Sequence, residues 1–200
     1  FTNDMGLEEA DKKRKIKKSK TFSNKIVFVN GFSASGKTML SPIISSMQNV
    51  ESMIYPYEIE WISSFLYNQK IDPGSYKEFI KQYADHTIYN QMMSRNSNFR
   101  FTDVSSVYNS GKFLKYLLRA FKKGDNHIPK IINEKKPITC FVSSHLIFFI
   151  NAISDALKKR LLFIETVRDP VYMFKQVSIL YKEVYIDNPE KVFTFQCFSN

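Results

Sequence analysis

The stretch VNGFSASGKTML at residues 29–40 contains Gly31, four further residues, and then Gly36, Lys37 and Thr38. Glycines let the backbone N–H groups of such a loop converge on phosphate oxygens, and a following helix adds the positive end of its dipole. The Lys37 ammonium would reach a terminal phosphoryl or sulfuryl group, and the Thr38 hydroxyl would donate a hydrogen bond or bind Mg²⁺. The spacing therefore predicts a phosphate-binding loop, with an ordinary turn between a strand and a helix as the alternative.

Three residues further along the chain could take part in the same chemistry, and each also has a purely structural interpretation. Glu165 closes the apolar run LLFIE and could position Mg²⁺ for a nucleoside triphosphate, or be a structural acid inside a longer strand. Arg168 could bind a second phosphate through its guanidinium fork, or hold the start of a helix through Asp169. His145 follows an apolar run and could act as a base, or be a partly buried histidine packed under a helix.

The loop must be positioned by the elements on either side of it. KIVFVNGF (25–32) is a short run rich in Val, Ile and Phe, which is typical of a fully buried parallel strand, and Asn-Gly breaks it. A helix is expected over 36–48, with Pro42 in its first turns, where a missing N–H is tolerated. A second strand is expected over 52–58, where Pro56 limits pairing.

The rest of the chain continues to alternate between helical and strand patterns. Apolar spacing predicts helices over 58–70, 76–96, 111–123 and 146–158, of which the third is the only one expected between 98 and 136. Further strands are expected over 138–144 and 161–167. A last helix should begin with Asp169 as its cap and Pro170 at its first position. This order indicates an α/β fold, a P-loop NTPase-like parallel sheet flanked by helices, with ligands at the carboxyl ends of the strands.

The positive charge of the chain is concentrated near its start. The net charge is +10, and KKRKIKKSK (12–20) carries seven positive charges against four negative ones in residues 1–11. Such a run is typical of a solvated tail, with a nucleic-acid or membrane-surface patch as the sharper alternative, and we expect no specific nucleic-acid binding because no recognition motif accompanies it. We therefore divide the chain into a basic, flexible leader (1–22) and one α/β domain (23–200). The ending TFQCFSN is interpreted as a C-terminal truncation.

Composition limits the class of protein. With 44% hydrophobic and 24% charged residues, the chain has the make-up of a folded domain. No apolar run reaches the ~20 residues that span a bilayer, so no transmembrane segment is expected. Cys140 lies in an apolar run and should be a buried thiol. Two cysteines are too few for a disulfide framework or a zinc site, so we expect no metal site and a reducing cytoplasmic location.

Three motifs follow one another along the chain, each after a strand-like run: SASGKTML, SSHL and VRDP. Together they resemble the sulfotransferase superfamily, which pairs a phosphate loop with a strand ending in a THL-like histidine and a later strand ending in RDP or RNP. The resemblance covers about residues 25–185. It implies a P-loop-type α/β enzyme that binds 3′-phosphoadenylyl sulfate without metal. The sulfuryl group would pass to a hydroxyl or amine of a small-molecule or carbohydrate acceptor, leaving adenosine 3′,5′-bisphosphate.

The resemblance assigns roles to residues of this chain by position. The 5′-phosphosulfate would lie on the loop formed by Ser33, Ala34, Ser35, Gly36, Lys37, Thr38 and Met39. Lys37 would stabilise charge on the leaving oxygen, because the family's basic residue two positions before the glycine is here Ala34. Arg168 would hold the 3′-phosphate. The family's serine eight residues later is here Gln176, with Ser178 two residues further on, and both are candidate ligands.

The resemblance leaves the catalytic base open. His145 matches the base that deprotonates the acceptor hydroxyl in the cytosolic branch of the family. Other branches use a glutamate just after the second strand, where Glu58 and Glu60 stand in this chain.

Two other functions compete with sulfuryl transfer. The same loop could serve a Mg-dependent kinase or NTPase binding ATP or GTP, with Glu165 and Arg168 as its metal and phosphate groups. It could also belong to a non-enzymatic binding module recruited by the basic leader.

Overall fold

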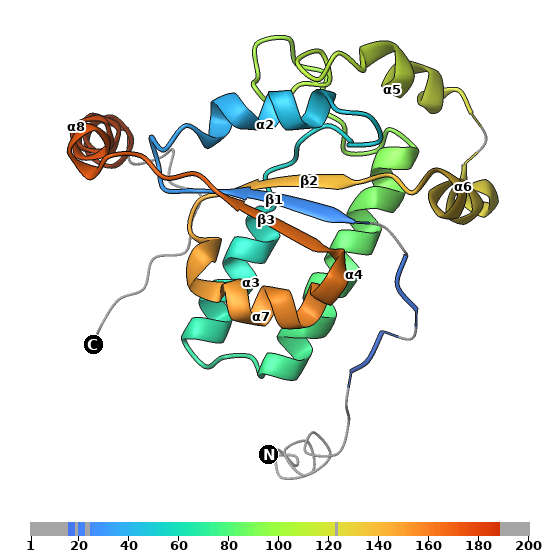
Figure 1. Cartoon of the computed structure of the whole chain (residues 1–200), viewed down its shortest axis with the longest axis horizontal. Helices are drawn as coiled ribbons and strands as arrows, with labels where there is room; N and C mark the ends of the chain where they lie inside the picture. The colour runs from blue at the N-terminus through green and yellow to red at the C-terminus, as the bar shows by residue number, and fades with distance from the viewer. Residues whose placement is uncertain (1–15, 19, 23–24, 123, 189–200) are drawn as a thin grey trace, which may run out of the picture.

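Three parallel strands form the centre of the fold, and they lie in the order β2-β1-β3. They are β1 (Ile26–Asn30), β2 (Thr139–Ser143) and β3 (Leu161–Glu165). The computed structural model describes residues 16–18, 20–22, 25–122 and 124–188. The expected parallel sheet flanked by helices is therefore confirmed (Figure 1).

The strands pair in a register that brings their carboxyl ends level with one another. Asn30 at the end of β1 lies opposite Ser143 of β2 on one side and Glu165 of β3 on the other. Glu165 is thus the last residue of its strand, and the expectation that this strand runs to residue 167 is wrong. Polar side chains from three strand ends meet at one edge, where ligands of parallel α/β sheets bind.

Helices cover both faces of the sheet, with α2 on one face and α3, α4 and α7 on the other (Figure 1). The α-helices are α2 (Lys37–Ser46), α3 (Tyr57–Tyr67), α4 (Pro73–Met92), α5 (Phe113–Ala120), α6 (Ile128–Lys135), α7 (Ile150–Leu157) and α8 (Pro170–Tyr181). Short 3₁₀ turns are η1 (Asp125–His127), η2 (Leu146–Phe149) and η3 (Lys158–Arg160), and the π-helix η4 (Lys182–Ile186) follows α8. None of the helices in the described part of the chain combines the length and apolar character needed to cross a membrane.

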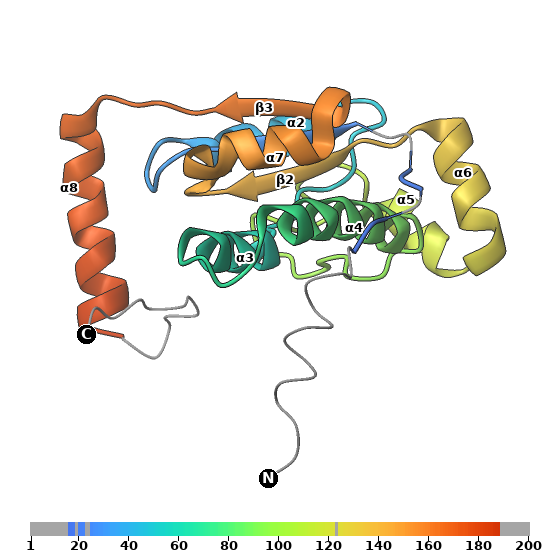
Figure 2. The same cartoon turned by 90° about the horizontal axis from the view of Figure 1, so that it is seen from below.

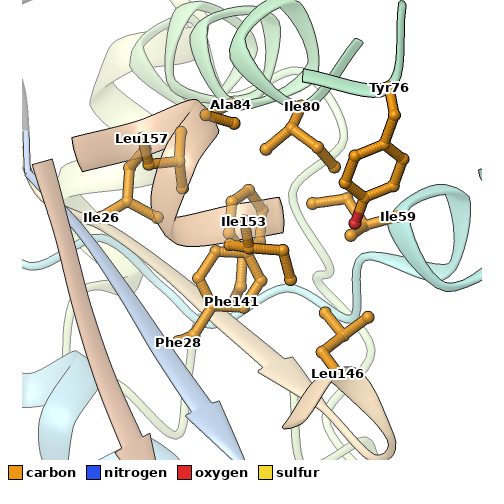
Figure 3. Packing of buried hydrophobic residues seen from close by; sticks show 11 residues of the cluster. Ile26, Phe28, Ile59, Tyr76, Ile80, Ala84, Phe141, Leu146, Ile153 and Leu157 are labelled. Atoms are coloured by element: carbon orange, nitrogen blue, oxygen red, sulfur yellow. The ribbon is translucent and has the colours of Figure 1, made fainter. Parts of the chain in front are cut away.

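Alternation along β1 divides the core into two layers. Ile26 and Phe28 face α4 and α7, where they pack with Phe141 and Ile153 (Figure 3). Val27 and Val29 face the opposite side, where they pack with Ile44 of α2. All five residues of β1 are buried, which explains why this central strand is apolar on both faces. Cys140 lies in the second layer, so the expectation of a buried thiol is confirmed.

Local sequence signals account for the starts of two helices. The Asp72 carboxylate accepts hydrogen bonds from the N–H groups of Gly74 and Ser75 at 2.9 and 3.0 Å, and Pro73 occupies the first turn of α4. The Asp169 carboxylate accepts from the N–H of Val171 at 2.8 Å and caps α8, as predicted. Each cap satisfies amides that the helix itself leaves without carbonyl partners.

The predicted second strand is only partly formed. Residues 50–54 run parallel to β2 and pair with it through two isolated bridges, at Val50 and Ile54. The helix α3 then begins at Tyr57, so Glu58 and Glu60 lie in its first turn and not in a strand. Pro56 explains the change, because it has no N–H to donate to a ladder and stands at the cap position of the helix.

The region 98–136 contains one helix more than expected. Besides α5, the helix α6 packs Ile128 and Ile132 against Ile88 and Met92 of α4. Only these two residues of α6 are buried, so its apolar pattern is too short to identify a helix from periodicity.

The last helix stands apart from the rest of the domain. Figure 2 shows α8 beyond the end of the sheet, joined to β3 by an extended stretch. No residue of α8 is buried. On the other side of the molecule, residues 16–18 and 20–22 make contacts with α4: the Lys18 and Phe22 amides donate to Glu78 and Asp85 at 2.7 and 3.1 Å.

Candidate functional site

Asn30 joins the ends of the three strands at the edge where the loop begins. Its Oδ1 atom accepts hydrogen bonds from the Ser143 hydroxyl at 2.8 Å and from the Leu146 N–H at 3.1 Å. Its Nδ2 atom donates to the Glu165 carboxylate at 2.6 Å. Asn30 is fully buried, so this network fixes the spacing of β1, β2 and β3 below the loop.

Gly31 is required by a close approach between the loop and the chain after β3. A Cβ at residue 31 would overlap the Thr166 Oγ1 and Ser35 Oγ atoms and would lie 2.7 Å from the Thr166 carbonyl oxygen. Two hydrogen bonds hold Thr166 next to the loop: its N–H and its hydroxyl donate to the Asn30 carbonyl at 2.8 and 3.0 Å. Its hydroxyl also bonds Ser35 Oγ at 2.7 Å. The loop is therefore clamped to the end of β3.

The middle of the loop turns through left-handed backbone conformations. Ala34 has φ 67° and Gly36 has φ 101°, and Gly36 is the residue that precedes α2. Residues with positive φ that alternate with residues of negative φ turn successive backbone N–H groups toward one side. This is the arrangement that binds anions in phosphate loops. The first amides of α2 add to it, because they have no carbonyl partners within the helix.

Lys37 is the buried cation of the site. Its side chain is 8% exposed, and its ammonium donates to the Phe32 carbonyl at 3.2 Å, across the loop. Burial lowers the pKa of Lys37, while the negative charges of Glu60 and Glu165 act in the opposite direction. Lys37 therefore lies under the loop with two carboxylates near enough to stabilise its charged form.

The two glutamates of α3 face different surroundings. Glu60 accepts a hydrogen bond from the Ser144 N–H at 3.0 Å, beyond the end of β2, and its charge acts on Lys37. Glu58 instead accepts from the Tyr83 hydroxyl of α4 at 2.7 Å. Of the two candidate bases on this helix, the structure places Glu60 toward the loop and Glu58 toward α4.

His145 lies at the rim of the loop and is exposed, so the expectation of a partly buried histidine packed under a helix is wrong. Its ring meets the Phe32 ring edge-on, with centroids 5.8 Å apart. Phe32 meets Phe148 in the same way at 6.0 Å. His145 is therefore accessible to a molecule bound above the loop.

Arg168 reaches from the chain after β3 to the opposite side of the loop. Its Nη1 atom donates to the Ala34 carbonyl at 3.4 Å and to the Gln176 side-chain oxygen at 3.0 Å. Its guanidinium lies 5.9 Å from the centre of the Tyr172 ring. Arg168 and Gln176, both predicted as ligands of a 3′-phosphate, thus lie next to each other, and both side chains are exposed. The Ser178 hydroxyl donates to the Phe174 carbonyl of its own helix at 2.8 Å.

The remaining predicted loop residues differ in their exposure. Ser35 is buried, and Ser33 and Ala34 are half-buried. Thr38 is exposed, so its hydroxyl can be reached by a ligand or a hydrated ion. Met39 is 80% exposed.

Sequence reasoning missed the residues that hold the loop in place. Asn30, Ser143 and Thr166 touch one another or the loop, yet each was treated only as part of a strand or turn. A buried amide that ends an otherwise apolar strand was the available signal, because such a group must find partners at the strand ends.

The arrangement can bind an anion on the loop, hold a second negative group at Arg168, and place a carboxylate or an imidazole beside it. Comparison with known proteins adds no relative: no protein-family model matches the chain, and no curated protein or solved structure matches it significantly.

Proposed function

We propose that the chain is a sulfotransferase-like enzyme of P-loop NTPase-like fold, which binds 3′-phosphoadenylyl sulfate on the loop 31–38. The observation that carries this proposal is the position of Arg168, which donates hydrogen bonds to the Ala34 carbonyl of the loop and to the Gln176 side-chain oxygen. A guanidinium at this place can bind a phosphate other than the 5′-phosphosulfate that lies on the loop. A 3′-phosphate is the group that separates this donor from ATP.

Different groups of the loop would stabilise different parts of the donor. Backbone N–H groups of residues 33–38 donate to the phosphosulfate oxygens, except that of Ser35, which donates to the Phe32 carbonyl at 3.1 Å. The left-handed turns at Ala34 and Gly36 fit that task. Lys37 stabilises the negative charge that grows on the bridging oxygen as it leaves. Because Lys37 is buried, it acts where water screens its charge least.

The transfer itself needs a base. The acceptor oxygen attacks sulfur, the bond between sulfur and the bridging oxygen breaks, and the acceptor proton passes to the base. Glu60 and His145 both lie beside the loop, whereas Glu58 is held by Tyr83. We therefore assign the base to Glu60 or His145, with Glu58 as the negative control.

A thermal-unfolding experiment with a ligand panel tests the donor. Adenosine 3′,5′-bisphosphate in the presence of EDTA should raise the unfolding midpoint, because a ligand that binds only the folded state stabilises it. Arg168→Ala should reduce this shift, whereas Lys175→Ala, which removes an exposed cation from the same segment, should not. An equal shift with adenosine 5′-phosphate in the unmodified chain would contradict the assignment of Arg168.

One observation favours a second candidate, a Mg-dependent kinase or NTPase. Glu165 stands at the tip of β3, acts on Lys37, and lies one strand away from the loop. A carboxylate there, together with the Thr38 hydroxyl, suits a Mg²⁺ ion bound to a nucleotide. Stabilisation by Mg-ATP or Mg-GTP, but not by the bisphosphate in EDTA, would favour this candidate. Stabilisation by neither would favour a binding module without catalysis.

A further inference from the structure

Two adjoining hollows lie beside the start of α3. The larger has a volume of about 390 Å³ and lies between the start of α3 and one side of α4. The smaller, of about 190 Å³, continues toward residues 96–107. They share the residues Ile54, Tyr55, Tyr57 and Asn96, and we call them together the tyrosine pocket.

Aromatic rings form one wall of the tyrosine pocket. Tyr55 and Tyr57 stack with centroids 6.0 Å apart and an interplanar angle of 24°. Trp61, one turn further along α3, continues the stack at 6.5 Å and 23°. Tyr83 lines the larger hollow from α4. Tyr57 stands between Tyr55 and Trp61 in this stack, is half exposed and lines both hollows, so the exposed part of its ring is apolar surface available to a molecule in the pocket.

Polar side chains line the rest of the larger hollow without a positive charge among them. Glu58, His86, Asn90 and Asn96 contribute a carboxylate, an imidazole and two amides. No lysine or arginine lines either hollow among the described residues. This lining differs from that of the loop 31–38 and disfavours an anionic ligand, because among the described residues it includes the acidic Glu58 side chain and no lysine or arginine.

The smaller hollow contains a buried acceptor without a donor. Gln91 is 2% exposed, and its Nε2 atom donates to the Ser52 carbonyl at 2.7 Å. Within the described residues no group donates to its Oε1 atom. A buried polar atom left in this state costs free energy, about 1–3 kcal/mol. The Oε1 atom itself has no exposed surface, so a molecule in the hollow reaches it only if the Gln91 side chain shifts.

We propose that the tyrosine pocket binds a neutral sugar unit. A pyranose ring presents C–H groups on its faces and hydroxyls around its edge, which matches a tyrosine wall beside carboxylate, amide and imidazole groups. Its hydroxyls both donate and accept, so they can donate to Glu58 and accept from the amide N–H groups of Asn90 and Asn96. The combined hollows have room for one or two sugar rings. The role of this sugar as the acceptor of a transferred group rests on the proposed function, whereas its binding does not.

The single tryptophan of the chain offers a direct test. Trp61 stacks on Tyr57, so a ring that packs on the tyrosine wall should change its fluorescence. Titration of the full chain with N-acetylglucosamine, galactose and cellobiose should give a saturable change for at least one sugar. The same titration in the presence of adenosine 3′,5′-bisphosphate separates this site from the loop: saturation by the sugar should persist whether or not the nucleotide binds.

Matched variants then locate the binding. Tyr57→Ala should weaken sugar binding about tenfold, a loss of ~1.4 kcal/mol that corresponds to one good aromatic contact. Tyr67→Ala, at the far end of the same helix and 77% exposed, should leave it unchanged. His86→Ala should weaken binding and His127→Ala should not, and both of these histidines are exposed, so the substitutions leave the core intact.

Isothermal calorimetry with the same sugars checks that the fluorescence reports binding. The proposal is overturned if no sugar binds the unmodified chain, if Tyr67→Ala and His127→Ala weaken binding as much as Tyr57→Ala and His86→Ala, or if only an aromatic compound such as phenol saturates the site.

Discussion

The substitution Gly31→Ala tests whether the loop is clamped to the end of β3. The added Cβ would lie 2.7 Å from the Thr166 carbonyl oxygen, whereas ordinary contacts begin at 3.4 Å, so the two segments must separate by about 0.7 Å. That movement strains the two hydrogen bonds from Thr166 to the Asn30 carbonyl. Overpacking costs about 1–3 kcal/mol and each weakened hydrogen bond up to about 1 kcal/mol, so we expect a loss of about 3 kcal/mol.

Thermal unfolding followed by circular dichroism measures this loss. For a chain of this length, 1 kcal/mol lowers the midpoint by about 2–4 °C, so Gly31→Ala should lower it by about 6–12 °C. Gly36→Ala is the control, because a Cβ there meets nothing within 4 Å and the cost comes only from φ 101°. Its midpoint should fall by about 2–4 °C, from a backbone cost of ~1 kcal/mol.

The double variant Gly31→Ala/Thr166→Ala sharpens the test. Removing the Thr166 hydroxyl relieves its own overlap with the added Cβ but leaves the contacts with Ser35 Oγ and the Thr166 carbonyl oxygen, so stability should recover only in part. The reasoning is refuted if Gly31→Ala is no less stable than Gly36→Ala, since the close approach would then have no energetic consequence.

Three further predictions concern charge and catalysis. Glu51 is buried beside Arg119, which donates to it at 2.7 and 2.9 Å, and its pKa falls from 4.5 to about 2 despite burial, which acts in the opposite direction. This pair should stabilise the fold above pH 4.5 by about 3.5 kcal/mol, at ~1.4 kcal/mol for each pH unit between 4.5 and 2, and this stability should be lost as the pH falls through 2. Denaturant titrations should show no such loss in Glu51→Gln. In a sulfuryl-transfer assay, Glu60→Gln or His145→Ala should lower kcat at least tenfold with little change in donor affinity, and a loss only on Glu58→Gln would reverse the assignment. Removing divalent ions with EDTA should leave the sulfuryl-transfer rate unchanged, and a rate that falls would contradict transfer without a metal.

The sequence was sufficient to predict the elements whose signals are local. The apolar run ending at Asn30 predicted a buried parallel strand, and Asp169 with Pro170 predicted the start of α8. The strand expected over 52–58 was shortened by Pro56, and α6 was missed because only Ile128 and Ile132 are buried. These failures occur where tertiary packing, and not periodicity, decides the local structure.

The site was predictable in its types of residue but not in their orientation. In a strand, Glu58 and Glu60 would point to the same face and could not be told apart as candidate bases. In the first turn of α3, Glu58 points toward Tyr83 and Glu60 toward Ser144. The partnership of Asn30 with Ser143 and Glu165 spans more than a hundred residues of sequence, so no local pattern could reveal it.

The affinity ratio for two nucleotides tests the central proposal most directly. Calorimetry in EDTA should show that the unmodified chain binds adenosine 3′,5′-bisphosphate at least tenfold more tightly than adenosine 5′-phosphate. A difference of ~1.4 kcal/mol is the smallest that a charge-assisted hydrogen bond from Arg168 to the 3′-phosphate would give. Equal affinities for the two nucleotides, or binding only of Mg-ATP or Mg-GTP, would contradict it.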